Sequence, residues 1–121
     1  MSFKDLFIEI GGEIRCGGFN KMGKDWVIGN DSPVENSRQS FFTTVHLRNT
    51  ALATSGNYRY YLEREGKKIN LSISPYTGKP VKTNVLSVSV KSENCLNADA
   101  WATALMLSLI HISEPTRRYA I

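Results

Sequence analysis

The hydrophobic periodicity of this chain changes once, near residue 97, and this change constrains the fold more than any other feature. Before it, apolar residues alternate with polar ones over short stretches, as in half-buried strands. We expect strands at residues 6–10, 13–16, 26–28, 43–48, 58–63, 68–73 and 85–90. After it, NADAWATALMLSLI is rich in Ala and Leu and lacks Gly and Pro, which indicates a helix. Strands followed by a helix predict an α+β fold: an antiparallel-rich sheet with a C-terminal helix.

Local signals refine the strand-rich part. In the first strand, Leu6, Ile8 and Ile10 are expected to form the partly buried face, and Gly11-Gly12 is expected to end the strand in a turn. The polar stretch 29–40 predicts a surface loop within one domain. A turn at Arg64-Glu65-Gly66 predicts a hairpin between strands 58–63 and 68–73.

The start of the helix carries its own signals. Asn97 is expected to be the helix N-cap, because its side chain can accept a hydrogen bond from a free backbone amide. Asp99 would then lie in the first turn, where the helix dipole favours a negative charge.

Composition excludes several classes of protein. With 121 residues, 41% of them apolar and 21% charged, the chain is long enough for one domain with a modest core and is not of the disordered class. It has no apolar run long enough to span a membrane. The net charge of +4 comes from scattered Lys and Arg rather than from a basic stripe, so no nucleic-acid partner is expected. Cys16 and Cys95 form no CxxC motif and are interpreted as two thiols.

The last residues do not look native. Residues 107–117, LSLIHISEPTR, match the conceptual translation of a widely used sequencing adapter over eleven positions. We therefore expect residues 1–106 to be part of one domain and residues 107–121 to be a non-native, adapter-derived tail, which fold reasoning should exclude. His111, which lies in this tail, is given no functional role.

Asp99 and Thr103 are the first candidate site. Their spacing of four places both side chains on one face of a helix. Both offer oxygen, and Mg²⁺ prefers oxygen ligands while keeping waters and substrate phosphates in its shell. The same two residues are also common in an ordinary helix, so the pair alone leaves both interpretations open.

Three Gly-containing segments are further candidates. In the loop ISPYTGKP, residues 73–80, Pro75 favours an extended Ser74 and Gly78 permits a tight turn, so the loop could present backbone amides to a flat ligand or a phosphate. Residues 53–58 and 11–14 could also let a ligand approach the backbone closely. Each segment could equally be a plain strand end or connection.

The order of these segments is more informative than any one of them. IGGEIR, ALATSGNYR, SPYTGKPV and C-x-x-A-D-A-x-A-T-A-L follow one another, and together they resemble the ApbE family of FAD:protein FMN transferases over roughly residues 5–106. The resemblance implies an incomplete, T-fold-like domain. It also implies a Mg²⁺-dependent transferase that moves FMN from FAD to a Ser or Thr hydroxyl of a target flavoprotein subunit and releases AMP.

The resemblance also assigns residues and surroundings. Asp99 and Thr103 would bind Mg²⁺, while Ile73, Ser74, Thr77 and Gly78 would contact FAD. The family's targets are flavin-carrying subunits of membrane redox pumps and related electron-transfer proteins. Family members are often periplasmic or lipid-anchored to the bacterial inner membrane, and any membrane association would come through an N-terminal anchor that this sequence lacks.

Two departures from the family pattern suggest an alternative. Leu71 stands where the family usually has His, and Ser74 stands where it has Asp or Asn. A non-catalytic flavin- or nucleotide-binding module is therefore the second interpretation, and a purely structural α+β domain is the third. Full-length members also carry a long N-terminal region with FAD contacts, so we expect this chain alone to be inactive.

Overall fold

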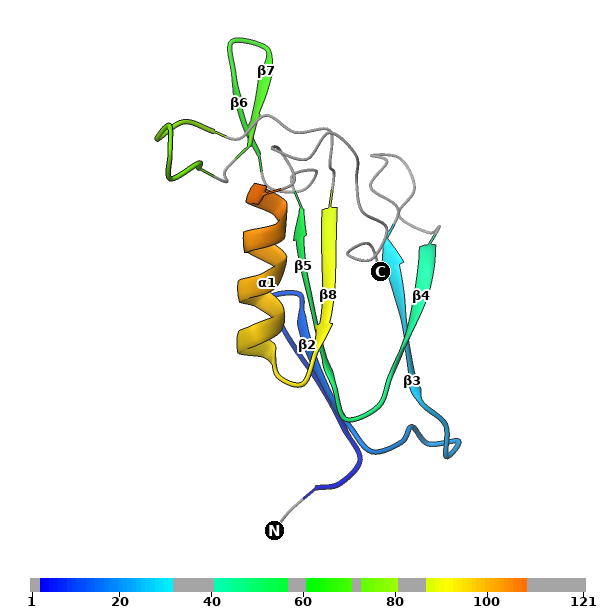
Figure 1. Cartoon of the computed structure of the whole chain (residues 1–121). Helices are drawn as coiled ribbons and strands as arrows, with labels where there is room; N and C mark the ends of the chain where they lie inside the picture. Colours follow the sequence, from blue (N-terminus) through cyan, green and yellow to red (C-terminus); the bar gives the residue numbers. More distant parts are fainter. Residues whose placement is uncertain (1–2, 32–40, 57–60, 71–72, 81–86, 109–121) are drawn as a thin grey trace.

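The computed structural model describes residues 3–31, 41–56, 61–70, 73–80 and 87–108 of the chain. Within them it has eight strands and one helix (Figure 1). The elements are β1 (Leu6–Ile10), β2 (Glu13–Gly17), β3 (Trp26–Asp31), β4 (Phe41–Leu47), β5 (Ala51–Gly56), β6 (Tyr61–Arg64), β7 (Lys67–Asn70), β8 (Ser87–Ser92) and α1 (Cys95–Ser108).

The main sheet has four antiparallel strands in the order β1-β2-β5-β8. Helix α1 lies along one face of this sheet, and the β3–β4 ribbon lies on the other side (Figure 1). Strands β6 and β7 form a separate hairpin. The expected α+β class, antiparallel strands with a C-terminal helix, is confirmed.

The alternation of β5 separates the two faces. Ala51 and Ala53 pack against Ala98 and Ala102 of α1, and all four are at most 1% exposed. Leu52, between them, points to the opposite face, as side chains of successive strand residues must. The ladder places Arg15 opposite Ala51 and Ile14 opposite Leu52, so the two faces can be followed from strand to strand. Alanine on both sides lets the helix approach the sheet closely.

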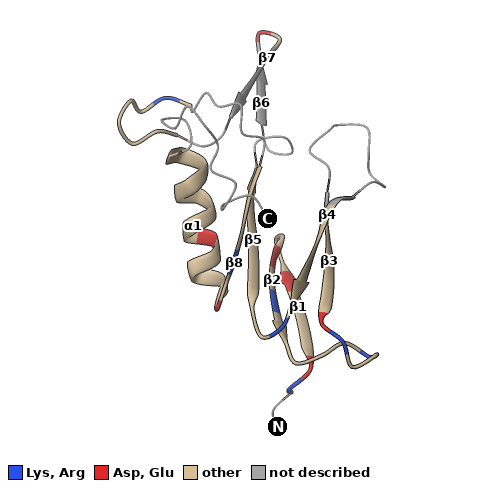
Figure 2. Ribbon diagram, turned by 45° about the vertical axis from the view of Figure 1, so that its right-hand side comes forward, with Lys and Arg blue, Asp and Glu red and all other residues tan. Residues whose placement is uncertain are grey.

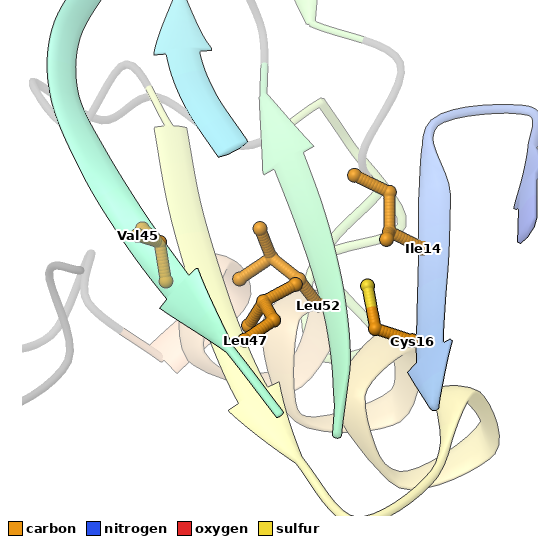
Figure 3. Close-up of a cluster of buried hydrophobic side chains, with 5 residues drawn as sticks. All are labelled: Ile14, Cys16, Val45, Leu47 and Leu52. Atoms are coloured by element: carbon orange, nitrogen blue, oxygen red, sulfur yellow. The ribbon is translucent and has the colours of Figure 1, made fainter. Parts of the chain in front are cut away.

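The larger core lies between the sheet and the β3–β4 ribbon (Figure 3). Its fully buried side chains, Cys16 and Leu47, are 0% exposed. Trp26 and Ile28 of β3 pack against its edge, and the Trp26 indole donates a hydrogen bond to the Gly17 carbonyl at 3.0 Å. The cluster is formed by Ile14, Cys16, Val45, Leu47 and Leu52.

Two tight turns follow the sequence signals. Gly11 and Gly12 join β1 to β2 with φ of 62° and 99°, left-handed values that glycine adopts without strain. The β6–β7 hairpin is confirmed, although its turn consists of Glu65 and Gly66 alone, because Arg64 is already paired with Lys67. The ends of the two expected strands, residues 58–60 and 71–72, lie outside the described residues.

Three strand-level expectations are wrong. Strand β5 (Ala51–Gly56) was not among the expected strands, because its Ala, Ser and Gly residues have low strand propensity and its pairing with β2 and β8 makes it extended. Residues 29–31, expected in a loop, extend β3 and pair with β4, because the sheet partner outweighs the low strand propensity of Gly, Asn and Asp. The rest of that loop, residues 32–40, lies outside the described residues. In β1, Ile8 and Ile10 are 49% and 75% exposed instead of partly buried. They share the sheet face that α1 covers, but α1 packs on β5 and β8 and leaves the edge strand open.

In the part of the chain that the structure describes, no helix is both long and apolar enough to cross a bilayer.

Candidate functional site

The helix that carries Asp99 and Thr103 begins three residues earlier than a cap at Asn97 would imply. Asn94 is the N-cap, since its side-chain oxygen accepts a hydrogen bond from the Asn97 amide at 2.8 Å. The expectation that Asn97 caps the helix and that Asp99 lies in the first turn is therefore wrong. The helix begins after Asn94 because this start lets Cys95 and Ala98 pack against the sheet. Asp99 lies in the second turn and is the only charged residue of α1 (Figure 2).

Asp99 and Thr103 lie on an exposed flank of α1, one helical turn apart. Ala98, Ala102 and Met106 form the buried stripe of the helix beside them. The opposite flank is marked by Leu105, which packs against Val88 and Met106 near β8. The flank with Asp99 and Thr103 therefore lies on the other side of the buried stripe from Leu105.

Thr103 is joined to the sheet through a hydroxyl pair. Its Oγ1 lies 3.3 Å from the Oγ of Ser55 on β5. Ser55 belongs to the segment 53–58 that sequence analysis singled out, whose Ala53 packs against α1. Two candidate segments, separated by 48 residues in the chain, thus meet at one place. Sequence analysis had marked the segment but had given Ser55 no role, because nothing in the sequence shows which hydroxyl faces the helix.

The loop 73–80 is closed by its own hydrogen bonds. Ile73 and Pro80 form an isolated antiparallel bridge, the Ser74 amide donates to the Lys79 carbonyl at 3.0 Å, and the Gly78 amide donates to the Ser74 carbonyl at 2.8 Å. Gly78 has φ of 65°, as a tight turn requires. The amides at 74 and 78 are thus already paired within the loop.

The side chains of the loop divide into buried and exposed. Ser74 is 5% exposed, and its hydroxyl accepts a hydrogen bond from the Tyr76 amide at 3.3 Å. The Thr77 hydroxyl accepts one from the Lys79 amide at the same distance. Ile73 and Tyr76, by contrast, are 49% and 86% exposed. The loop therefore offers exposed side chains on a rigid turn. Leu71, at the position of the family His, lies outside the described residues.

Figures 1 and 2 both place the loop 73–80 beyond the C-terminal end of α1. Asp99 is nine residues before the last residue of the helix, Ser108, which corresponds to about 14 Å along the axis. Thr103 is closer to that end. The helix flank and the loop therefore lie at successive positions along the helix axis, with the loop beyond the end of α1.

The donors on α1 suit a hard cation that keeps other ligands. Asp99 offers a carboxylate and Thr103 a hydroxyl, both exposed, and such oxygens are what Mg²⁺ takes from proteins. Over the described ranges, no three His, Cys, Asp or Glu side chains gather to hold a metal ion. A cation at this flank would complete its shell with waters or ligand phosphates.

Comparison with known proteins places these features in a family. The model of the ApbE family matches residues 1–112. The chain belongs to the ApbE family. It is 39% identical over 104 residues to the FAD:protein FMN transferase of Vibrio cholerae, covering 86% of this chain and 31% of that protein. It is 34% identical to the enzyme of the same name from Haemophilus influenzae, covering 88% of this chain and 31% of that protein.

Solved ApbE structures share the fold. The ApbE protein of Thermotoga maritima superposes with a TM-score of 0.77 at 33% identity, covering 88% of this chain and 33% of that one. The flavin transferase ApbE of Vibrio cholerae gives 0.69 at 36% identity, covering 86% and 32%. The chain thus spans about a third of the length of its ApbE relatives, which fits the expected incomplete domain.

Proposed function

We propose that this chain is the cation-binding part of an FAD:protein FMN transferase, which moves FMN from FAD to a Ser or Thr hydroxyl of a target flavoprotein and releases AMP. The observation that carries the proposal is the exposed Asp99–Thr103 flank of α1, fixed to β5 at Ser55, in a chain of the ApbE family. The relatives named as FMN transferases support the reaction.

In this proposal Asp99 and Thr103 hold Mg²⁺. When bound, the ion would offset the charge of the FAD diphosphate and of the departing AMP. Asp99 contributes the negative charge and Thr103 a neutral oxygen. Asp99 is the only charged residue of α1, so it is the one carboxylate that the helix offers to the ion.

The loop 73–80 would contact the flavin-containing ligand. Ile73, Ser74, Thr77 and Gly78 are the residues assigned to it. The internal hydrogen bonds of the loop and the burial of Ser74 favour a role as a rigid wall, with the exposed Ile73 side chain against the ligand. A dinucleotide with its diphosphate at the cation and its flavin at the loop would join the two parts of the proposed site. The loop is therefore not proposed to bind the ligand through the backbone amides of Ser74 and Gly78, because both already donate hydrogen bonds within the loop.

A chimera tests the proposal. Residues 5–106 would replace the matching third of the Vibrio cholerae FMN transferase, and covalent flavin on an acceptor domain would be measured with FAD, with and without Mg²⁺. We expect labelling that requires Mg²⁺ and that Asp99→Asn reduces by more than about tenfold. Binding of FAD without transfer would instead favour the non-catalytic flavin-binding module. A folded chimera with neither FAD binding nor transfer would overturn the proposal.

A further inference from the structure

The hydroxyl of Ser55 is the one polar group of β5 that the structure brings to the Asp99–Thr103 flank. We infer that Ser55 is a positioning residue, which fixes the Thr103 hydroxyl so that its oxygen faces a bound divalent cation. This inference rests on the proposed function, because it needs the cation site on α1. The juxtaposition that carries it is the 3.3 Å contact between Ser55 Oγ and Thr103 Oγ1.

The direction of the Thr103 hydroxyl hydrogen decides whether its oxygen can face a cation. A threonine hydroxyl has one hydrogen to donate and two lone pairs to offer. A cation repels that hydrogen, so Thr103 can present a lone pair only if its hydrogen points elsewhere. Ser55 Oγ supplies the acceptor, since either atom of the pair can be the donor. The Thr103 hydroxyl then donates to Ser55, and its lone pairs are left for the cation.

The sheet fixes the position of Ser55. This residue lies on β5, which is paired with β8, and its ladder partner is Val88, which is 2% exposed. Thr103, by contrast, is on an exposed helix flank, where its χ1 can take either of the two rotamers that a helical threonine adopts. Through the hydrogen bond, the fixed position of Ser55 on the sheet holds the Thr103 hydroxyl, the proposed cation ligand, in one orientation. Groups that orient metal ligands in this way commonly affect affinity about 10–100-fold.

A matched control comes from a second hydroxyl pair in the same sheet, formed by Thr54 of β5 and Ser89 of β8. Thr54 Oγ1 and Ser89 Oγ lie 2.7 Å apart, and Ser89 is 3% exposed. Thr54 alternates with Ser55, so this pair lies on the sheet face turned away from α1. Ser89→Ala removes a buried serine hydroxyl from the same sheet without touching the helix flank.

The experiment is nuclear magnetic resonance on the 121-residue chain with Mn²⁺ as the probe. In the wild type, we expect Mn²⁺ to broaden the amide signals around Asp99 and Thr103, and side-chain couplings to show one Thr103 rotamer. Ser55→Ala should average that rotamer and raise the Mn²⁺ concentration for half-maximal broadening about tenfold. Ser55→Thr, which keeps the hydroxyl, should restore both, and Ser89→Ala should change neither, even if it lowers the melting temperature.

The outcomes separate the inference from the proposed function. If Ser55→Ala leaves both the Mn²⁺ midpoint and the Thr103 rotamer unchanged while the wild type binds, the inference is wrong and the cation site stands. If the wild type shows no broadening near Asp99 and Thr103, the cation site fails and the inference fails with it. An equal effect of Ser89→Ala on the Mn²⁺ midpoint would show general destabilisation and would also overturn the inference.

Discussion

Asp99 and Thr103 share one flank of α1, but they are held differently. Thr103 contacts Ser55, whereas the Asp99 carboxylate makes no hydrogen bond to another described side chain and lies exposed. An exposed carboxylate without a structural partner adds little to stability, so its contribution can be tested separately from folding. This is the expected condition of a group whose partner is a ligand.

Asp99→Asn keeps the shape of the side chain and removes its charge. We expect the free energy of unfolding to change by less than about 0.5 kcal/mol, as for most surface substitutions. If Asp99 holds the cation as proposed, the Mn²⁺ concentration for half-maximal broadening should rise by more than about tenfold, since the substitution removes the charge that attracts the cation. Glu93→Gln, a similar change at an exposed residue just before the helix, is the control. Equal Mn²⁺ affinity in both variants would contradict the assignment of Asp99.

Cys16 gives a prediction about pH. Burial raises the pKa of its thiol, and the nearby Arg15 offsets part of this rise. The folded chain therefore holds the thiol proton to higher pH than the unfolded chain does. The stability that this contributes is complete below the ordinary thiol pKa and is lost as the pH rises through the raised value.

Urea unfolding of the wild type at pH 7.5 and at pH 10 should therefore show a loss of stability at the higher pH. In Cys16→Ala this loss should be smaller, because the titrating group is gone, although the variant is less stable at both pH values. Cys95→Ala removes the partly exposed thiol and with it the smallest cause of the raised Cys16 pKa, so it should keep most of the wild-type pH dependence. The same pH dependence in Cys16→Ala would contradict the prediction.

At the scale of single elements, the position of the helix cap is directly testable. Asn94→Ala removes the acceptor for the Asn97 amide and should lower the free energy of unfolding by about 1 kcal/mol. Asn97→Ala, at the position that the sequence favoured, should change it by less than about 0.5 kcal/mol, since that side chain is exposed inside the helix. Thermal or urea unfolding of the two variants measures the difference. A larger loss from Asn97→Ala would place the cap back at residue 97.

The contact between helix and sheet depends on small residues. Ala102 is 0% exposed and packs against the buried alanines of β5. Ala102→Leu should destabilise the chain by about 1–3 kcal/mol, because the helix must move away from the sheet. It should also disturb the Ser55–Thr103 contact, which is one residue along. Ala104→Leu, the same change at an exposed position of α1, is the control and should have little effect on unfolding.

The elements were largely predictable from the sequence, and their exceptions have physical causes. The change of period at residue 97 and the Gly-Gly and Glu-Gly turns indicated strands followed by a helix, but they did not reveal β5 (Ala51–Gly56), the strand that joins β2 to β8. Residues 29–31 were missed because a neighbouring strand, not their own propensity, makes them extended. Asn97 was expected as the cap and Asn94 was missed, because packing against the sheet decides where the helix begins. Asp99 and Thr103 could be paired by spacing, but the contact with Ser55 joins residues 48 apart.

At the scale of the whole molecule, several large apolar side chains lie uncovered. Leu96 and Trp101 of α1 are 80% and 60% exposed, and Ile10 of β1 is 75% exposed. Burying one such side chain contributes about 1.5–3 kcal/mol, so leaving several in water is costly. This pattern could not be foreseen from local periodicity, which shows where apolar residues recur but not whether another layer covers them. It agrees with a chain that spans about a third of its ApbE relatives.

The last prediction concerns the activity of the chain by itself. The proposed transfer of FMN needs FAD, cation and acceptor hydroxyl held together, and small misplacements of reacting groups already cost about 100-fold in rate. The described residues offer one flank with two donors and one loop, on about a third of the length of the relatives. We therefore expect the 121-residue chain, incubated with FAD, Mg²⁺ and an acceptor domain, to give no covalent flavin by in-gel fluorescence or mass spectrometry. The intact Vibrio cholerae enzyme, under the same conditions, is the positive control. Mn²⁺ broadening at Asp99 in the same inactive sample would show that the cation site forms before the rest of the catalytic arrangement, whereas robust flavin transfer by the chain alone would contradict the prediction.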